Sequence, residues 1–175
     1  MELGHTVLLV PAPTLEPFVR ARWEQYDPAW VSTDPAFAHA HITVLSPFLQ
    51  PPLDRDDLQR VERVVRRHSA FEFELRRVDT FPNGIIHVLP DPDDGFRRLT
   101  AEMVATFPQC PPYAGEFPDP APHLTLDLAH GEVTEESVSA DVAALLPATG
   151  CRADRVQLAW YAQGGCRVLE EWPLT

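Results

Sequence analysis

Two short stretches of this sequence place a histidine and a threonine two positions apart, with apolar residues between and after them. The first, HITV, begins at His41, and the second, HLTL, begins at His123. In an extended strand, residues i and i+2 point to the same face, so each stretch would project one imidazole and one hydroxyl together. The pattern therefore predicts two strands whose polar faces have the same composition.

Two imidazoles that face each other can cleave a phosphoester without a metal ion. A neutral histidine takes a proton from the attacking oxygen, and a protonated histidine donates one to the departing oxygen. His41 and His123 suit both roles because the ordinary pKa of histidine lies near neutrality. The hydroxyls of Thr43 and Thr125 can hydrogen-bond the non-bridging phosphate oxygens. A 2′,3′-cyclic phosphate fits such a site well, since its strained ring opens with one acid and one base.

Either motif alone is more simply explained by a histidine satisfied inside a core beside a strand threonine. The chain has seven histidines in 175 residues. Two such motifs would then arise by chance in well under about 1% of sequences of this composition. The pair therefore favours one shared site.

His39 and His41 also form a His-x-His pair of the kind that can bind zinc. Such a site needs at least a third protein ligand, and none stands at a recognisable spacing, so we expect no metal. A metal-dependent hydrolase that uses His39, His41 and His123 stays open as an alternative. The other histidines have no evident partner; we expect His130 at a strand end, and structural roles for His5, His68 and His87.

Two further groups of residues could contribute to a phosphate or nucleotide site. Some arginines lie on or near predicted strands and could supply charge to a phosphate, although solvated strand faces are their more common role; they are Arg76, Arg77, Arg152, Arg155 and Arg167. Aromatic residues near the motifs could stack on a base, although core packing is commoner; they are Phe48, Phe81, Tyr113 and Tyr161.

Hydrophobic periodicity and turn residues predict the elements that must position these groups. We expect strands over 6–13, 41–48, 71–81, 85–90, 123–128, 152–162 and 166–172, and helices over 14–26, 53–68, 93–107 and 134–146. Thr14, Asp54 and Thr134 are the expected N-caps. The proline-rich segment 108–122 predicts an irregular connection.

The order of these elements predicts an α+β fold with an internal duplication. Each half would carry one His-x-Thr strand followed by a helix and a hairpin, and a pseudo-twofold axis would bring the two polar faces together across a cleft. No linker divides the chain, so we expect a single domain over residues 1–175 in two lobes.

Composition limits the partners and the compartment. The net charge is -12, which argues against a long RNA because phosphate neutralisation needs a basic footprint. A small phosphate ligand in a local pocket stays compatible with that charge. The three scattered cysteines indicate free thiols. No apolar run approaches the ~20 residues of a membrane helix, and the first residues do not form a signal peptide. We therefore expect a cytoplasmic monomer without a membrane partner.

Two His-apolar-Thr-apolar strands about 80 residues apart resemble the two-histidine (2H) phosphoesterases. The stretches HITVLSPF and PPYAGEFPDPAPHLTLDLAH are similar to the LigT-like branch, the 2′-5′ RNA ligase family. This resemblance implies a bilobal α+β fold, with two antiparallel sheets flanked by helices around a central cleft. It also implies cofactor-free, metal-independent chemistry on 2′,3′-cyclic phosphates or 2′-5′ bonds.

Carried over to this sequence, the resemblance makes His41 and His123 the acid–base pair and Thr43 and Thr125 the phosphate binders. It implies a nucleotide or a short oligonucleotide as the partner and a cyclic phosphodiesterase as the activity. Two alternatives stay open within the same fold. One is a nucleotide-binding module that grips phosphate without turnover, and the other is a 2′-5′ RNA ligase.

Overall fold

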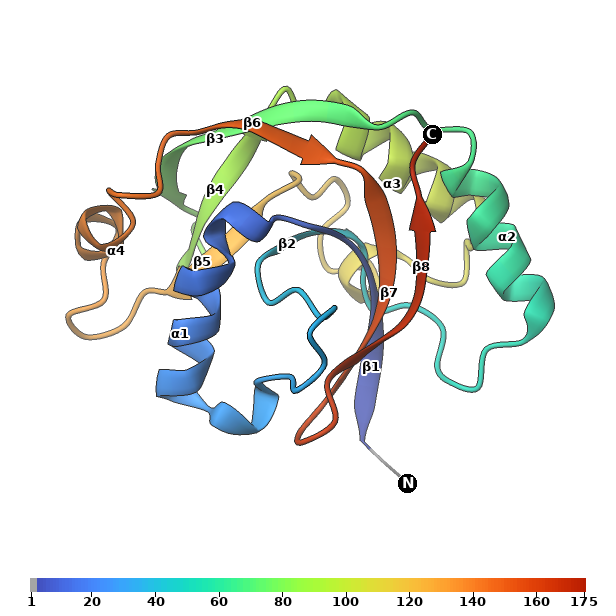
Figure 1. Ribbon diagram of the computed structural model, residues 1–175, viewed down its shortest axis with the longest axis horizontal. Coiled ribbons are helices and arrows are strands. Elements are labelled where there is room, and N and C mark those ends of the chain that lie inside the picture. Colours follow the sequence, from blue (N-terminus) through green and yellow to red (C-terminus); the bar gives the residue numbers. More distant parts are fainter. Residues whose placement is uncertain (1–2) are drawn as a thin grey trace.

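A computed structural model describes residues 3–175 of the chain (Figure 1). The strands are β1 (Gly4–Pro11), β2 (His41–Leu45), β3 (Phe71–Thr80), β4 (Ile85–Asp91), β5 (Leu124–Leu128), β6 (Ala148–Ala153), β7 (Arg155–Ala162) and β8 (Arg167–Pro173). The helices are α1 (Glu16–Tyr26), α2 (Arg55–Val65), α3 (Asp94–Thr106) and α4 (Glu135–Asp141). The expected α+β class is confirmed. Within residues 3–175, no helix is long and apolar enough to cross a membrane.

The eight strands form one antiparallel sheet in the order β6-β3-β4-β5-β2-β1-β7-β8. At its centre, β2 and β5 are joined by the single registered pair Ile42 and Leu124. The two separate sheets expected from the sequence are therefore linked through this narrow contact. We call β2-β1-β7-β8 the first-motif lobe and β5-β4-β3-β6 the second-motif lobe, after the motif strand that each contains.

The lobes do not correspond to the two halves of the sequence. The hairpin β3–β4 follows the first motif along the chain, yet it pairs with β5 of the second-motif lobe. The hairpin β7–β8 follows the second motif, yet it pairs with β1 of the first-motif lobe. Each motif strand is followed along the chain by a helix and a hairpin, as the element order predicts, but each hairpin pairs with the lobe of the other motif. The expected strand 152–162 is also two strands, because the chain crosses between the lobes at Asp154.

Local capping agrees with the sequence at two helices and differs at the third. Asp54 accepts a hydrogen bond from the amide of Asp57 at α2, and Thr134 forms a reciprocal capping box with Ser137 at α4. Thr14 is not a cap, because Pro13–Leu15 form a short 3₁₀ turn and α1 begins only at Glu16. Helix α4 ends at Asp141, five residues before the expected end.

Burial alternates along both motif strands as the period-2 pattern predicts. Ile42 and Val44 of β2 are buried, and so are Leu124 and Leu126 of β5. The core beneath them is contiguous and takes in apolar residues from α2 and α3, which lie together at one end of the molecule in Figure 1. Since the apolar residues are held in this core, the histidine and threonine side chains of both strands are left on the opposite face.

Candidate active site

The polar residues of both motifs line one cavity of about 640 Å³. His41 and Thr43 contribute from β2, Thr125 from β5, and His123 from the position immediately before β5. This volume lies within the range of ordinary small-molecule sites. The structure therefore brings together all four residues that the sequence singles out.

The pairing of β2 with β5 explains why the four residues meet. Ile42 is registered with Leu124, and the strands are antiparallel. In that register His41 lies opposite Thr125, and Thr43 lies opposite His123. Each imidazole is thus set beside the hydroxyl contributed by the other strand, which is the arrangement expected of a pseudo-twofold axis.

Hydrogen bonding fixes which ring nitrogen of each histidine faces the cavity. Nδ1 of His41 lies 3.1 Å from the carbonyl oxygen of His39, and Nδ1 of His123 lies 2.8 Å from that of Ala121. A carbonyl oxygen can only accept, so Nδ1 carries the hydrogen in both rings. Nε2 is therefore the atom of each ring that can take up or release a proton.

Both imidazoles are neutral in the unliganded protein at pH 7. Burial lowers the pKa of His41 to about 4, although hydrogen bonds to the backbone and the nearby carboxylate of Glu16 act in the opposite direction. Burial also lowers the pKa of His123; the hydrogen bond to Ala121 opposes this shift, and His87 adds to it. Each Nε2 then presents a lone pair to the cavity.

A carboxylate from α1 supports the first motif. Oε1 of Glu16 lies 2.6 Å from Nδ1 of His39 and accepts from the His39 amide, while Oε2 accepts from the Ala40 amide at 2.7 Å. Burial opposes ionisation of Glu16, but these hydrogen bonds outweigh it and hold its pKa below the ordinary value. Because the carbonyl of His39 anchors His41, Glu16 holds the backbone that orients that imidazole.

His39 is part of this support and not a free ligand. The amide of Ser32 donates to its Nε2 at 3.1 Å, so that nitrogen carries no hydrogen, and Nδ1 donates to Glu16. Both ring nitrogens are occupied, which leaves no lone pair for the zinc site considered from the His-x-His spacing. Within residues 3–175, no group of three or more His, Cys, Asp or Glu side chains is arranged to hold a metal ion.

Aromatic and imidazole rings pack around His123 of the second motif. His87 of β4 lies with its ring centroid 5.8 Å from that of His123, and it stacks on Phe81 at 3.6 Å. Phe81 meets the edge of His123 at 5.0 Å. The local sequence pattern indicates no partner for His87. His87 is registered with Thr125, so knowledge that β4 pairs with β5 would have placed His87 at the site.

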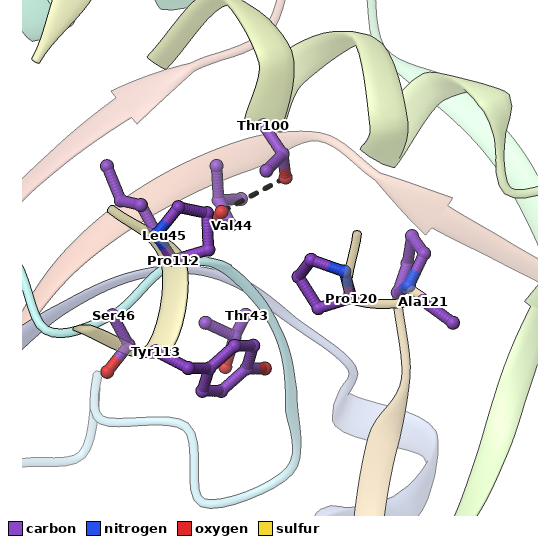
Figure 2. A pocket seen from close by; sticks show the side chains of 10 residues that line it. Thr43, Val44, Leu45, Ser46, Thr100, Pro112, Tyr113, Pro120 and Ala121 are labelled. Carbon is purple, nitrogen blue, oxygen red and sulfur yellow. Dashed lines mark hydrogen bonds between the residues drawn. The ribbon is translucent and has the colours of Figure 1, made fainter. Parts of the chain in front are cut away.

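The proline-rich segment contributes Tyr113 to the cavity wall. Its amide donates to the carbonyl of Ser46 at 2.7 Å. Figure 2 shows the Tyr113 ring beside Thr43, with Pro120 and Ala121 across a small adjoining pocket. Tyr113 has a φ of 50°, which an L-residue adopts only when surrounding contacts hold it there. The segment is thus fixed against β2 at the site.

The arginine of the cavity is one that the sequence analysis passed over. Arg22 of α1 lines the wall, whereas none of the five arginines considered from the strand pattern does so. Nε of Arg22 lies 3.2 Å from Asp127, and Nη2 lies 2.5 Å from Asp141. Asp127 also accepts from the hydroxyl of Tyr26. Position 127 is two residues after Thr125, so the i, i+2 pattern could have placed it on the site face.

A family model and several solved structures are similar to this chain. A model described as the 2′-5′ RNA ligase superfamily matches residues 11–165. E. coli LigT complexed with 3′-AMP is 16% identical with a TM-score of 0.58, and the match covers 98% of each chain. TT0787 of Thermus thermophilus is 19% identical with a TM-score of 0.59 and 97% coverage of each. E. coli LigT complexed with ATP is 15% identical with a TM-score of 0.56, and the match covers 98% of each chain. No curated protein sequence matches the chain.

Proposed function

Because the chain belongs to the 2′-5′ RNA ligase superfamily, we propose that it is a metal-independent phosphodiesterase that opens nucleoside 2′,3′-cyclic phosphates. The observation that carries the proposal is the pair of imidazoles in one cavity, each with Nδ1 bonded to a carbonyl and Nε2 left for proton transfer. Bonds of the 2′-5′ type present the same phosphodiester chemistry and are the second substrate to test.

In the proposed reaction, a water oxygen attacks phosphorus while one Nε2 takes its proton. The bond from phosphorus to O2′ or O3′ breaks, and the other Nε2, protonated beforehand, gives its proton to the departing oxygen. The hydroxyls of Thr43 and Thr125 donate to the non-bridging oxygens as charge builds on them. The product is a nucleoside phosphomonoester, and the two histidines end with their protonation states exchanged.

We assign the base to His41 and the acid to His123. His41 has the larger fall in pKa, to about 4, so it is the imidazole that stays neutral over the widest pH range. His123 is less strongly shifted and is more readily protonated when an anionic substrate enters. The free-enzyme profile of kcat/KM should then be bell-shaped, with an acid limb near pH 4 and an alkaline limb below about 6.5.

The test is an assay of the purified protein in EDTA against the four 2′,3′-cyclic nucleoside monophosphates and a 2′-5′-linked dinucleotide. Chromatography identifies the product isomer. His41→Ala and His123→Ala are the inactivating variants, and His68→Ala, next to Glu102 and outside the cavity, is the matched control. Turnover by wild type and His68→Ala alone supports the proposal. Nucleotide binding without turnover would replace it with a binding function.

A further inference from the structure

The cavity is larger than a phosphate and a ribose require, and its remaining wall comes from α1. The lining residues from this helix are Val19, Arg22, Trp23 and Tyr26, and their i, i+3, i+4, i+7 spacing keeps them on one face. Leu128 and His130, at and beyond the end of β5, complete this part of the wall. The cavity wall therefore combines the four motif residues with a face of α1 that carries two aromatic rings, an aliphatic side chain and Arg22.

The aromatic rings of this wall are exposed to the cavity and not covered by the core. Of the six exposed large hydrophobic side chains in residues 3–175, three line this one cavity: Trp23 (38% exposed), Tyr26 (44%) and Leu128 (53%). Leu15 and Val19, earlier in the same segment, are buried. Exposed apolar surface gathered in a concave site indicates a ligand with an apolar face.

Neighbouring contacts hold the two aromatic rings in place. The Tyr26 hydroxyl donates to Asp127, and its ring meets the His130 ring edge-on at 5.7 Å. The Trp23 ring rests against that of Trp30 at 6.4 Å. A preformed aromatic wall loses little side-chain entropy when a planar ring stacks on it.

The charges of the cavity limit the charge of the phosphate. Arg22 is the only arginine on its wall within residues 3–175, and Asp127 and Asp141 both neutralise it. The two imidazoles are neutral in the free protein. Protonation of His123 on binding then supplies one positive charge beside the hydroxyls of Thr43 and Thr125, and this charge balances one negative charge on the phosphate better than two.

We infer that Trp23 and Tyr26 form a base-binding wall, and that the site selects nucleoside phosphodiesters with a single negative charge over phosphomonoesters. The inference rests on the proposed function for the position of the phosphate, between His41 and His123. Its consequence is that the product, which gains a second charge above its second pKa of about 6, binds more weakly than the substrate.

Calorimetric binding with probes that the enzyme cannot turn over tests this inference apart from catalysis. The first probe is 2′-deoxyadenosine 3′-methylphosphate, which carries one charge and has no 2′-hydroxyl. The second is 2′-deoxyadenosine 3′-phosphate, which is largely dianionic at pH 7.5. The third is 1-O-methyl-2-deoxyribose 3-methylphosphate, which lacks the base. The variants are Trp23→Ala and Trp23→Phe, with Leu89→Ala as a control because Leu89 is exposed on β4 outside the cavity.

We expect Trp23→Ala to weaken binding of the first probe by about 5- to 100-fold, as loss of base stacking does, and to leave the third unchanged. Trp23→Phe should restore most of the affinity, and Leu89→Ala should match wild type. At pH 7.5 the first probe should bind at least about tenfold more tightly than the second, and the gap should narrow at pH 5 as the monoester takes up a proton.

Equal affinity of Trp23→Ala and wild type for the first probe would overturn the base wall, as would the absence of any binding. A dianion that binds as tightly as the monoanion at pH 7.5 would overturn the charge selection. A protein that binds these probes as expected, yet leaves cyclic phosphates intact, would retain this inference and lose the proposed function.

Discussion

The two motifs have the same sequence pattern but different surroundings. His41 is anchored through a carbonyl that a half-buried carboxylate supports, with Glu16 bonded to His39 and to two backbone amides. His123 is anchored in the same way through Ala121, but rings of Phe81 and His87 enclose it. Two motifs of the same pattern in one cavity thus give like residues different electrostatic environments.

These surroundings explain how near-identical motifs can take opposite roles. Glu16 favours a positive charge on His41, and His87 disfavours one on His123, yet deeper burial dominates and leaves His41 with the larger fall in pKa. The neighbours and the burial of each ring, and not the motif letters, therefore decide which imidazole holds the proton. Each prediction below tests whether the asymmetry between the two sides is functional.

The largest expected effect separates the two histidines by leaving group. His41→Ala and His123→Ala should each lower kcat/KM on a cyclic phosphate by about 100-fold or more, since each removes a proton-transfer group. On a nucleoside 3′-(4-nitrophenyl) phosphate, whose leaving group needs no proton, His123→Ala should regain most of its rate and His41→Ala should not. Rescue of His41→Ala in its place would reverse the two assignments.

The two threonines should also differ. Thr125 is exposed to the cavity, whereas Thr43 is half-buried and lies beside the ring of Tyr113 (Figure 2). We expect Thr125→Val to lower kcat/KM by about 100-fold, as loss of one donor to a developing charge does, and Thr43→Val to cost less. Thr43→Ser and Thr125→Ser, which keep the hydroxyl, are the matched controls. Equal losses of kcat/KM in the two valine variants would mean that the position of Tyr113 beside Thr43 does not make the two threonines functionally different.

Stability should decrease as the pH is lowered, mainly because of the first motif. A histidine whose folded pKa is about 4 binds fewer protons than in the unfolded chain, where its pKa is about 6.5, so unfolding is favoured as pH falls between these values. For His41 this costs on the order of 1–2 kcal/mol between pH 7 and pH 5. Urea unfolding at both pH values should show a smaller loss in His41→Gln than in wild type or His123→Gln. Indistinguishable losses in all three proteins would contradict the stronger burial of His41.

The smallest expected effect is a pair of opposite pKa shifts. Glu16→Gln removes a negative charge and should lower the pKa of His41. His87→Phe removes an imidazole that disfavours a positive charge on His123, keeps a stacking ring, and should raise the pKa of His123. NMR titration of carbon-13-labelled histidine measures both without reference to activity. We expect about a tenfold loss of kcat/KM or less in each variant, well below the loss from removing a proton-transfer group. pKa shifts of the same sign in the two variants would show that Glu16 and His87 do not have opposite electrostatic effects on the two histidines.

Local patterns in the sequence were enough to predict the two motif strands, their polar faces and the chemistry that they could perform. Period-2 alternation predicted that Ile42 and Leu124 are buried, because apolar side chains at positions i and i+2 of a strand lie on the same face and pack into the core together. The caps at Asp54 and Thr134 follow from hydrogen bonds between near neighbours in the chain. The paired motifs predicted four residues that the fold does bring into one cavity.

Which elements meet at the site depended on the tertiary structure. The exchange of hairpins between lobes places His87 beside His123, and the docking of α1 sets Arg22 and Tyr26 against Asp127 and Glu16 beneath His39. These contacts join residues far apart in the chain, and no local periodicity carries information on which strand pairs with which. Periodicity likewise predicts that α1 is a helix, but only packing decides that its second half, with Trp23, lines a cavity and not a core.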